Sequence, residues 1–370
     1  MTGVLVAGGG VAGSAAACLL AQGGHAVTLI ERETGPVHKI CGEFISHEAG
    51  QYLAGLGLDL AGLGARPITH VRLVRGGDVA EARLPFAAQS LTRRTLDEAL
   101  LHRAAAAGVA VRRGHAVRAI AGGVVDVAGL GALRPAALFL ATGKHDLHGL
   151  RRAVPRLAAD LVGFKMYFVL SPAQSRALAG CVEVMLFADG YAGLQMVEGG
   201  QANLCLLTSR ARLAAAGGAW PALLADLQRE CAHLARRLDA ATPVLDQPLA
   251  IARVPYGFIH AARRADPPDV FRLGDQAGVI PSFSGDGMSM ALHSAHAASA
   301  AFLAGQGAYA YHRRFAADIA VQMRVAQAAY RVGRSPLGQT LLMATARLWP
   351  GSLRLIAGLT RVPEGVLLGA

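Results

Sequence analysis

Short apolar runs and glycine-rich turns alternate over the first 31 residues. The run Val4 to Ala7 predicts a buried strand, and the glycines after it predict a turn. Residues 11–22 have the small and apolar side chains of a helix that ends at Gly23 and Gly24. Residues 25–31 (HAVTLIE) predict a second strand. These elements together predict a β–α–β unit.

The rest of the chain keeps this mixed pattern and changes it in the middle. Residues 92–107 and 220–238 are each predicted to form one helix, because leucine and alanine recur at helical spacing. Between residues 162 and 207 the pattern alternates, and Asp189-Gly190 and Gly199-Gly200 are turn signals, which is typical of antiparallel strands. The other predicted elements are strands at 109–112, 116–120, 137–141 and 270–273, a helix at 287–303, and helical structure to the end.

The first glycine turn has the spacing of a dinucleotide-binding motif. Gly8, Gly10 and Gly13 form G-x-G-x-x-G between the predicted strand and helix, and Glu31 ends the next strand, 18 residues after Gly13. In such a turn Gly8 allows the bend, Gly10 lets a pyrophosphate approach the helix N-terminus, and Gly13 lets helix and strand pack closely. Glu31 is expected to bind ribose hydroxyls and to repel a 2′-phosphate. The motif therefore predicts an adenine dinucleotide without that phosphate.

Pieces of this nucleotide-binding pattern come from both ends of the chain. We predict an α/β protein in which a Rossmann-like dinucleotide-binding domain is interleaved with a β-sheet substrate domain and followed by a helical C-terminus. The predicted bounds are 1–160 and 261–335 for the first domain, with strand excursions to the substrate sheet near 65–90, then 161–260 for the second and 336–370 for the C-terminal segment.

Composition excludes several classes of protein. Of the 370 residues 53% are hydrophobic and 16% charged, which excludes a disordered chain. The net charge is +11, but the arginines are scattered and the only lysines are Lys39, Lys144 and Lys165, so we expect no nucleic-acid partner. His293 and His296 share a helix face without an evident third ligand, and we expect no metal site.

Five widely spaced cysteines without a C-x-x-C pair favour a reducing cytoplasm. The apolar N-terminus lacks the basic region of a signal peptide, and no apolar run reaches the roughly 18 residues that span a bilayer. Residues 337–368 mix leucines with Arg347, Arg354 and Arg361. This segment is either a helix packed on the body or a basic interfacial helix in peripheral contact with the inner face of the membrane. Nothing in the sequence indicates the oligomeric state.

A downstream segment distinguishes between dinucleotides. Residues 271–278 read FRLGDQAG, and Pro281 and residues 284–288 (SGDGM) follow. With the first glycine motif and residues 93–97 (RRTLD), this pattern resembles the FAD-dependent para-hydroxybenzoate hydroxylase superfamily over nearly the whole chain. Within it, residues 39–43 (KICGE) resemble the K-x-C-G-G segment of the geranylgeranyl reductase-like branch. The resemblance implies a flavoprotein oxidoreductase with FAD, for which we find no covalent attachment signal.

The resemblance also implies roles for individual residues. Asp275 would bind the FAD ribitol, the turn from Gly285 to Met288 would bring backbone N–H groups to the flavin N1–C2=O edge, and Arg93 would lie near the diphosphate or ribose. The full set of expected cofactor-binding residues is Gly8, Gly10, Val11, Ala12, Gly13, Glu31, Arg32, Cys41, Gly42, Arg93, Thr142, Gly143, Gly274, Asp275, Gly285, Asp286, Gly287 and Met288.

The chain departs from the pattern at several positions. Thr142-Gly143 stands where many hydroxylases have Asp-Gly, which puts direct reduction by NAD(P)H in doubt and leaves a reductase partner as the other electron donor. Gly278 is more typical of reductases and flavin halogenases than of hydroxylases. Glu43 replaces the second glycine of K-x-C-G-G, and Tyr191 remains from a reductase element that lacks its Trp here. Halogenases have a lysine beside W-x-W-x-I-P, and because that segment is absent we do not expect halogenation.

Three residues are candidates for catalysis. Cys41 would gate the flavin or act as a weak acid, Glu43 would act as a base if burial raised its pKa, and Tyr191 would bind a polar head of the substrate; each is otherwise a core residue. An apolar sheet face, either core or pocket lining, predicts an apolar polyketide, isoprenoid or acyl-like substrate. That face comprises Phe164, Met166, Phe168, Met185, Phe187, Leu194 and Met196.

Three reactions fit these features. Monooxygenation through a flavin C4a-hydroperoxide is favoured. Reduction of a carbon–carbon double bond, as in geranylgeranyl reductases, and dehydrogenation with oxygen or a partner as acceptor are the alternatives. A further alternative is that the protein is not an enzyme and acts as an FAD-bound regulator.

Overall fold

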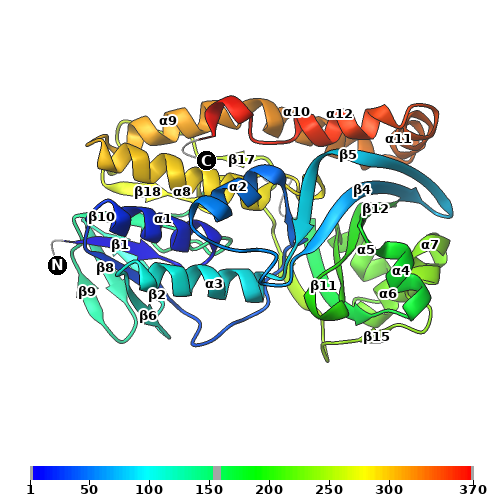
Figure 1. The fold of residues 1–370 in the computed structure, drawn as a ribbon, viewed down its shortest axis with the longest axis horizontal. Helices are drawn as coiled ribbons and strands as arrows, with labels where there is room; N and C mark the ends of the chain where they lie inside the picture. The colour runs from blue at the N-terminus through cyan, green and yellow to red at the C-terminus, as the bar shows by residue number, and fades with distance from the viewer. Residues whose placement is uncertain (1–2, 153–159, 368–370) are drawn as a thin grey trace.

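A parallel sheet of five strands forms one half of the computed structural model, which describes residues 3–152 and 160–367 (Figure 1). In sheet order the strands are β18 (Val270–Arg272), β10 (Ala137–Leu140), β1 (Val4–Ala7), β2 (Val27–Glu31) and β6 (Ala110–Arg113). The strands are short, and the two at the centre, β10 and β1, are entirely apolar and buried, as expected where both faces of a parallel sheet are covered. The edge strand β6 ends in two arginines and is partly exposed.

The two faces of this sheet are covered by different layers. Val4 and Val6 of β1 point to a helical layer, whereas Leu5 and Ala7 pack with Ile120 of a small antiparallel sheet, because side chains alternate along a strand. The helical layer is α1 (Val11–Gln22), α3 (Arg93–Ala106) and α8 (Gly287–Leu303), and the small sheet is β7 (Val117–Ala121), β8 (Val124–Val127) and β9 (Gly131–Leu133).

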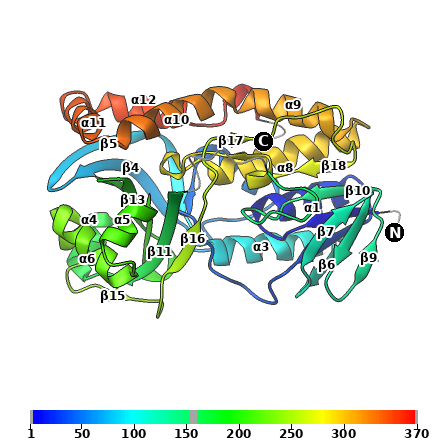
Figure 2. The same cartoon turned by 180° about the vertical axis from the view of Figure 1, so that it is seen from behind.

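A second sheet of nine strands forms the other half of the molecule (Figure 2). Its strands are antiparallel except where β12 runs parallel to β4. The strands are β3 (Phe44–Ile45), β4 (Arg66–Arg75), β5 (Asp78–Ser90), β11 (Leu161–Val169), β12 (Cys181–Phe187), β13 (Gly190–Met196), β14 (Ala202–Ser209), β15 (Thr242–Pro243) and β16 (Leu249–Ala252).

One face of this sheet is core. The face predicted as core or pocket lining packs against helices; its members Phe164, Met166 and Phe168 join Leu223 and Leu227 in one buried cluster. The opposite face, which includes Leu73, Leu186 and Tyr191, looks toward the half with the parallel sheet and the C-terminal helices. The covering helices are α4 (Pro172–Leu178), α5 (Arg210–Ala215), α6 (Trp220–Glu230) and α7 (Ala232–Arg237).

The prediction of one helix over 220–238 is wrong, because the chain breaks at Cys231. Cys231 has extended backbone angles (φ −118°, ψ 91°). The break lets the N–H of His233 donate to the carbonyl of Gly76 at 3.1 Å. It also lets His233 and Arg237 reach the buried carboxylate of Glu183, at 2.9 and 2.7 Å. Tertiary hydrogen bonds thus replace one turn of helix.

The chain from Ala308 onward is helical and lies along one side of both halves (Figures 1 and 2). Helix α9 packs on α8 and β18, and α11 and α12 pack on β5. The helices are α9 (Ala308–Asp318), α10 (Ala320–Gly333), α11 (Pro336–Leu348) and α12 (Gly351–Leu359), and α2 (His47–Gly55) lies near α8. The remaining short elements are β17 (Phe258–Ile259), β19 (Gly278–Val279) and the 3₁₀ turns η2 (Glu198–Gly200), η3 (Gly274–Gln276), η4 (Ser282–Ser284) and η5 (Glu364–Val366).

Candidate functional site

In the glycine turn between β1 and α1, a side chain at Gly8 or Gly13 would overlap backbone atoms. Gly8 has φ +110°, and a Cβ there would overlap the carbonyl oxygen of Ala141. A Cβ on Gly13 would overlap the carbonyl oxygen of Gly8. Helix α1 begins after Gly10 without a side-chain cap, and Gly10, Val11 and Ala12 line a cavity. The helix N-terminus therefore offers free N–H groups to an anion.

Two cations lie over this turn. A Cβ on Gly10 would be 3.3 Å from Nη2 of Arg93 and 3.7 Å from Nζ of Lys39. Both side chains pair with Asp97: Arg93 Nε lies 2.7 Å from Oδ1, and Lys39 Nζ lies 2.8 Å from Oδ2. Burial would raise the pKa of Asp97, but the two cations outweigh it and the pKa is lowered. Arg93, Lys39 and Asp97 together carry one excess positive charge, and the two cations lie where they could contact a diphosphate at the helix N-terminus.

Glu31 joins the second strand to the turn. Its Oε2 accepts from the N–H of Gly9 at 2.6 Å, and its Oε1 accepts from the N–H of Glu33 at 2.9 Å. The residue is buried yet lines the cavity, as does its neighbour Arg32, whose side chain is half exposed and pairs with Glu33. Glu31 is therefore held at the place where the sequence predicts a ribose.

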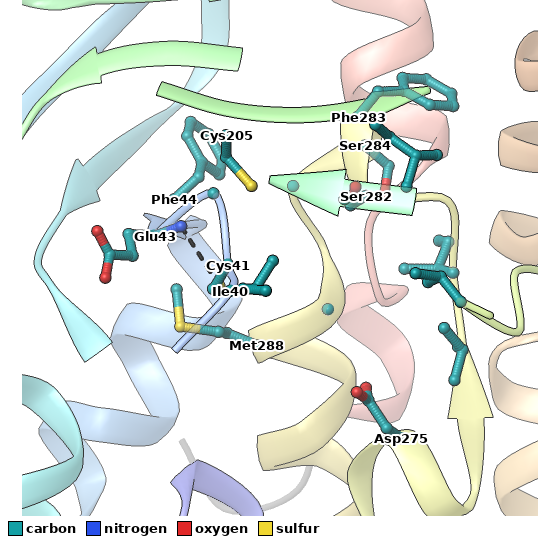
Figure 3. Close-up of a pocket in the computed structure, with 18 of the residues that line it drawn as sticks. Ile40, Cys41, Glu43, Phe44, Cys205, Asp275, Ser282, Phe283, Ser284 and Met288 are labelled. Carbon is teal, nitrogen blue, oxygen red and sulfur yellow. Dashed lines mark hydrogen bonds between the residues drawn. The ribbon is translucent and has the colours of Figure 1, made fainter. Parts of the chain in front are cut away.

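The downstream residues converge on the same cavity from the other side. Asp275 points into it (Figure 3), and Thr142, Gly143 and Gly274 line it at the ends of neighbouring strands. Helix α8 begins at Gly287 without a side-chain cap, and Met288 also lines the cavity (Figure 3). A second helix N-terminus therefore faces the space where the flavin edge is predicted.

Two predicted cofactor residues, Gly13 and Asp286, do not line the cavity. Gly13 packs against the turn itself, and Asp286 is turned to another part of the molecule. The Asp286 carboxylate is fully buried and faces the C-terminal segment. It accepts from Nε2 of Gln322 at 3.0 Å, and Nη1 of Arg361 lies 3.4 Å away. Burial raises the pKa of Asp286 to about 7, against the opposing effect of Arg361. The side chain thus anchors the turn, and only its backbone belongs to the predicted flavin contact.

The cavity is continuous from the glycine turn to the nine-stranded sheet and has a volume of about 1030 Å³. Cavities that bind one small ligand are typically about 300–1,000 Å³. The volume therefore suits a dinucleotide cofactor together with a substrate. Beyond Asp275 the walls are mainly apolar and include Leu73, Leu84, Phe86, Val182, Val184, Leu186, Ile251, Val254, Phe283, Leu342, Leu353 and Ile356.

The loop with Cys41 and Glu43 lies between the two halves. Cys41 and Gly42 line the cavity, and the Sγ of Cys41 accepts from the N–H of Glu43 at 3.3 Å (Figure 3). The Glu43 carboxylate points away from the cavity centre. It is fully buried, with Nζ of Lys165 at 2.5 Å and the Tyr167 hydroxyl at 2.7 Å. Burial raises the pKa of Glu43, although Lys165 opposes the rise.

Glu43 and its partners fasten this loop. Lys165 also donates to the carbonyl of Lys39 at 3.0 Å. The Nδ2 of Asn203 lies 3.1, 3.0 and 3.0 Å from the Cys41 carbonyl, the Gly42 carbonyl and the Glu43 carboxylate. The backbone N–H of Arg93 donates to Glu43 at 2.7 Å. The Glu43 carboxylate thus points away from the cavity centre and accepts hydrogen bonds from several donors. A general base would need an unoccupied carboxylate oxygen that faces the substrate, so Glu43 is placed to position the loop.

Three hydroxyl groups meet in the apolar part of the cavity. The Tyr191 hydroxyl lies 3.0 Å from that of Tyr256, and both contact the Ser282 hydroxyl. The residues come from β13, the segment before β17, and η4. Burial raises the pKa of both tyrosines, so both are neutral donors. We refer to Tyr191, Tyr256 and Ser282 as the hydroxyl cluster.

The two helix histidines are parts of the core, and His293 is hydrogen-bonded there. His293 lies 2.9 Å from the Tyr52 hydroxyl and 3.0 Å from a carboxylate oxygen of Asp318, and His296 packs on the Tyr52 ring at 4.4 Å. Within residues 3–152 and 160–367 no group of three or more His, Cys, Asp or Glu side chains is placed to hold a metal ion.

Sequence reasoning missed six residues of this site: Lys39, Asp97, Lys165, Asn203, Tyr256 and Ser282. Lys39 and Asp97 stand inside the two motifs used for Cys41 and Arg93, and their opposite charges were a usable signal. Lys165 was the one charged residue in an apolar stretch. Asn203, Tyr256 and Ser282 carry no local signal, because their partners are far away in the chain.

Comparison with known proteins gives the fold. No protein-family model matches the chain. The flavin-dependent brominase Bmp2 superposes with a TM-score of 0.77 over 96% of this chain and 93% of its own, at 18% identity. The myxobacterial chondrochloren halogenase CndH gives 0.74 over 99% and 92%, at 20% identity. A flavoprotein/dehydrogenase from Cytophaga hutchinsonii gives 0.73 over 99% and 98%, at 15% identity. The predicted α/β architecture is thereby confirmed.

A similarity in sequence is more restricted. Squalene epoxidase 5 of Arabidopsis thaliana is 37% identical to this chain over 86 residues. That stretch is 23% of this chain and 17% of the plant protein. The match therefore concerns a segment, and no activity follows from it alone.

Proposed function

We propose that the chain is an FAD-dependent oxidoreductase that acts on an apolar small molecule, with monooxygenation as the favoured reaction. The observation that supports this most is that one continuous cavity of about 1030 Å³ runs between the two halves. It joins an uncapped helix N-terminus behind Gly10, a second one at Gly287, and the apolar wall of the nine-stranded sheet. The first helix N-terminus suits the diphosphate of a dinucleotide, the second suits the flavin edge, and the apolar wall suits an apolar substrate.

The residues fit FAD in particular ways. Gly10 leaves room for the diphosphate beneath Arg93 and Lys39, and Glu31 is placed for ribose hydroxyls. Asp275 faces the middle of the cavity, as a partner of the ribitol would. The N–H groups at the start of α8 would stabilise negative charge on the flavin edge. When bound, the reduced flavin would supply the electrons for activating dioxygen.

The chain's own residues have three tasks in such a reaction. The apolar wall around Leu73, Leu186 and Val254 excludes water from the reacting groups. The hydroxyl cluster holds one oxygen of the substrate, because each hydroxyl can turn its proton toward a ligand. The network of Glu43 and Lys165 keeps the Cys41 loop against the cavity. We therefore expect a mainly apolar substrate with one hydroxyl or carbonyl head.

Reduction of a carbon–carbon double bond is the second candidate. Cys41 lines the cavity and would provide a proton to a carbon atom there. The resemblance of residues 39–43 to reductases of geranylgeranyl groups supports the same reaction. NAD(P)H or a reductase partner would supply electrons in either case.

Halogenation, the activity named for Bmp2 and CndH, has less support from the residues. All three lysines of the chain are engaged: Lys39 by Asp97, Lys144 by the carbonyl of Ile40 at 3.1 Å, and Lys165 by Glu43. Lys165 does not line the cavity.

The first test is FAD binding. We expect the purified protein to be yellow, and Gly13→Ala to lose FAD because the added Cβ overlaps the Gly8 carbonyl. Gly77→Ala is the matched control, since a Cβ there meets no atom within 4 Å. A colourless wild-type protein that takes up no FAD would refute the proposal.

The second test separates the reactions. The reduced protein is supplied with ¹⁸O-labelled dioxygen, bromide and a panel of apolar substrates such as squalene and a phenolic polyketide. One labelled oxygen atom in the product supports monooxygenation. Two added hydrogens without label support reduction, two lost hydrogens support dehydrogenation, and a brominated product would overturn the choice in favour of halogenation.

A further inference from the structure

The outer faces of the last three long helices expose apolar side chains. Of the 13 large hydrophobic residues that are exposed within residues 3–152 and 160–367, eight belong to α10, α11, α12 or the turn between the last two. A surface helix ordinarily turns such residues inward. The eight are Val321, Val332, Leu337, Leu341, Leu348, Trp349, Leu355 and Leu359.

These residues form stripes rather than scattered points. On α11, Leu337, Leu341 and Leu348 are 71%, 56% and 88% exposed, and their spacing of four and seven residues puts them on one helix face. Leu355 and Leu359 on α12 are four residues apart. Helices α10, α11 and α12 pack on one another, so their stripes belong to one layer of the molecule (Figures 1 and 2).

The same segment contains basic residues and no acidic residue. Between Ile319 and Pro363 there are six arginines and no lysine, aspartate or glutamate. Arg361 pairs with Asp286 and Arg347 with Asp78. The others have no ion pair within the described part of the chain; they are Arg324, Arg331, Arg334 and Arg354. Each lies within one helical turn of an exposed apolar residue, as in helices that lie at a bilayer surface.

The substrate cavity reaches the surface in this layer. Leu341 and Arg334 are exposed and also line the cavity. Leu342, Leu353 and Ile356 continue its wall inward from the same helices. An apolar molecule that enters here would pass along apolar side chains from the outer stripe to the wall of the nine-stranded sheet.

We propose that α10, α11 and α12 dock on the surface of an anionic lipid bilayer and open the substrate cavity toward it. The leucines and Trp349 would enter the region of the acyl chains, and the unpaired arginines would contact anionic head groups. A second copy of this chain fits less well, because it would bring the arginines of both copies together. The entry route for substrate rests on the proposed function, whereas the docking does not.

Vesicle binding tests the docking directly. The full chain with FAD is sedimented with phosphatidylcholine vesicles that contain phosphatidylglycerol, and with vesicles of phosphatidylcholine alone. We expect the protein to pellet with the anionic vesicles and to be released as sodium chloride is raised, because salt screens the arginines.

Two triple variants isolate the leucine stripes. Leu337→Ser/Leu348→Ser/Leu355→Ser removes exposed residues that do not line the cavity, and we expect its partition onto vesicles to weaken by at least about tenfold. Leu130→Ser/Val169→Ser/Leu303→Ser removes three exposed aliphatic residues elsewhere and is expected to bind as wild type does. Circular dichroism and FAD absorbance report whether each variant is folded.

Several results would overturn the proposal. One is wild-type protein that stays in solution with anionic vesicles, and another is equal loss of binding in both triple variants. Capture by an immobilised acidic acyl carrier protein without vesicle binding would assign the layer to a protein partner. A dimer in gel filtration that only the first variant dissociates would assign it to a second copy. A protein that pellets but fails to bind FAD would refute the proposed function and leave the docking intact.

Discussion

Replacing Lys165 with methionine tests the ion pair that fastens the Cys41 loop to the nine-stranded sheet. Lys165 and Glu43 are both fully buried, 2.5 Å apart. The variant leaves the Glu43 carboxylate buried without its cation and also removes the hydrogen bond to the Lys39 carbonyl. Because breaking a buried pair from one side typically costs about 3–5 kcal/mol, we expect the free energy of unfolding to fall by that amount.

Two further variants check this reasoning. Lys165→Met/Glu43→Gln removes the stranded charge as well, and we expect it to recover most of the loss, to within about 1–2 kcal/mol of wild type. Arg347→Met is the matched control, because its pair with Asp78 is exposed, at 58% and 61%, and such pairs contribute less than about 1 kcal/mol.

The assay is urea unfolding followed by tryptophan fluorescence. Trp220 on α6 packs on Phe164 at 5.6 Å between ring centres and reports the sheet domain. A loss below about 1 kcal/mol in Lys165→Met, or a double variant no more stable than the single one, would refute the role assigned to the pair.

The effect should also depend on pH in a definite direction. Burial raises the pKa of Glu43 above its usual value of 4.5, and removing Lys165 takes away the effect that opposes the rise. A carboxyl whose pKa is raised on folding contributes stability below its unfolded pKa and loses it as pH rises through the folded pKa. The deficit of Lys165→Met relative to wild type should therefore shrink as the pH is lowered from 7 toward 4.5. A deficit that stays constant over this range would contradict the assignment.

Four other predictions follow from the site. Gly10→Val should abolish FAD binding, measured by flavin absorbance, because its side chain would occupy the space beneath Arg93. Tyr191→Phe or Ser282→Ala should weaken the binding of a phenol probe, seen as a smaller flavin spectral change, by about tenfold each, with FAD affinity unchanged. Asp286→Asn should become more stable relative to wild type as pH rises from 3.8 toward 7, because the pKa of Asp286 is raised to about 7 and its contribution is lost over that range; urea unfolding measures this. Alkylation of Cys41 by iodoacetamide, measured by mass spectrometry of the labelled peptide, should slow when FAD is added, because Cys41 lines the cavity. An unchanged rate of alkylation would place Cys41 outside the cofactor space.

Local patterns in the sequence were sufficient to predict the fold of the half with the parallel sheet. Gly8 and Gly13 are constrained by atoms a few residues away or on the neighbouring strand, so their spacing carries the information. The helix predicted over residues 287–303 has the same bounds as α8, because its start and end are also marked by neighbouring residues in the sequence. The sheet face of Phe164, Met166 and Phe168 was recognised by alternation, but alternation does not say which face lines a cavity.

The failures have a common cause in contacts between distant segments. The break at Cys231 depends on Gly76, which is 155 residues away in the chain. The partners of Glu43 lie on β11 and β14, and its carboxylate turns from the cavity toward Lys165, Tyr167 and Asn203. Burial and pairing of a charge are properties of these contacts, so no pattern around Glu43 distinguishes a base from an anchor.

The amino-acid order alone was enough to predict a glycine turn between strand and helix, an α/β architecture and a basic, leucine-rich C-terminus, because each is a repeated or closely spaced local feature. Only the folded chain reveals that the turn, the hydroxyl cluster and the C-terminal helices share one cavity. It also reveals that the leucines of α11 face outward. Periodicity places residues on a face of an element, but which face is covered depends on the packing of elements that lie far apart in the sequence.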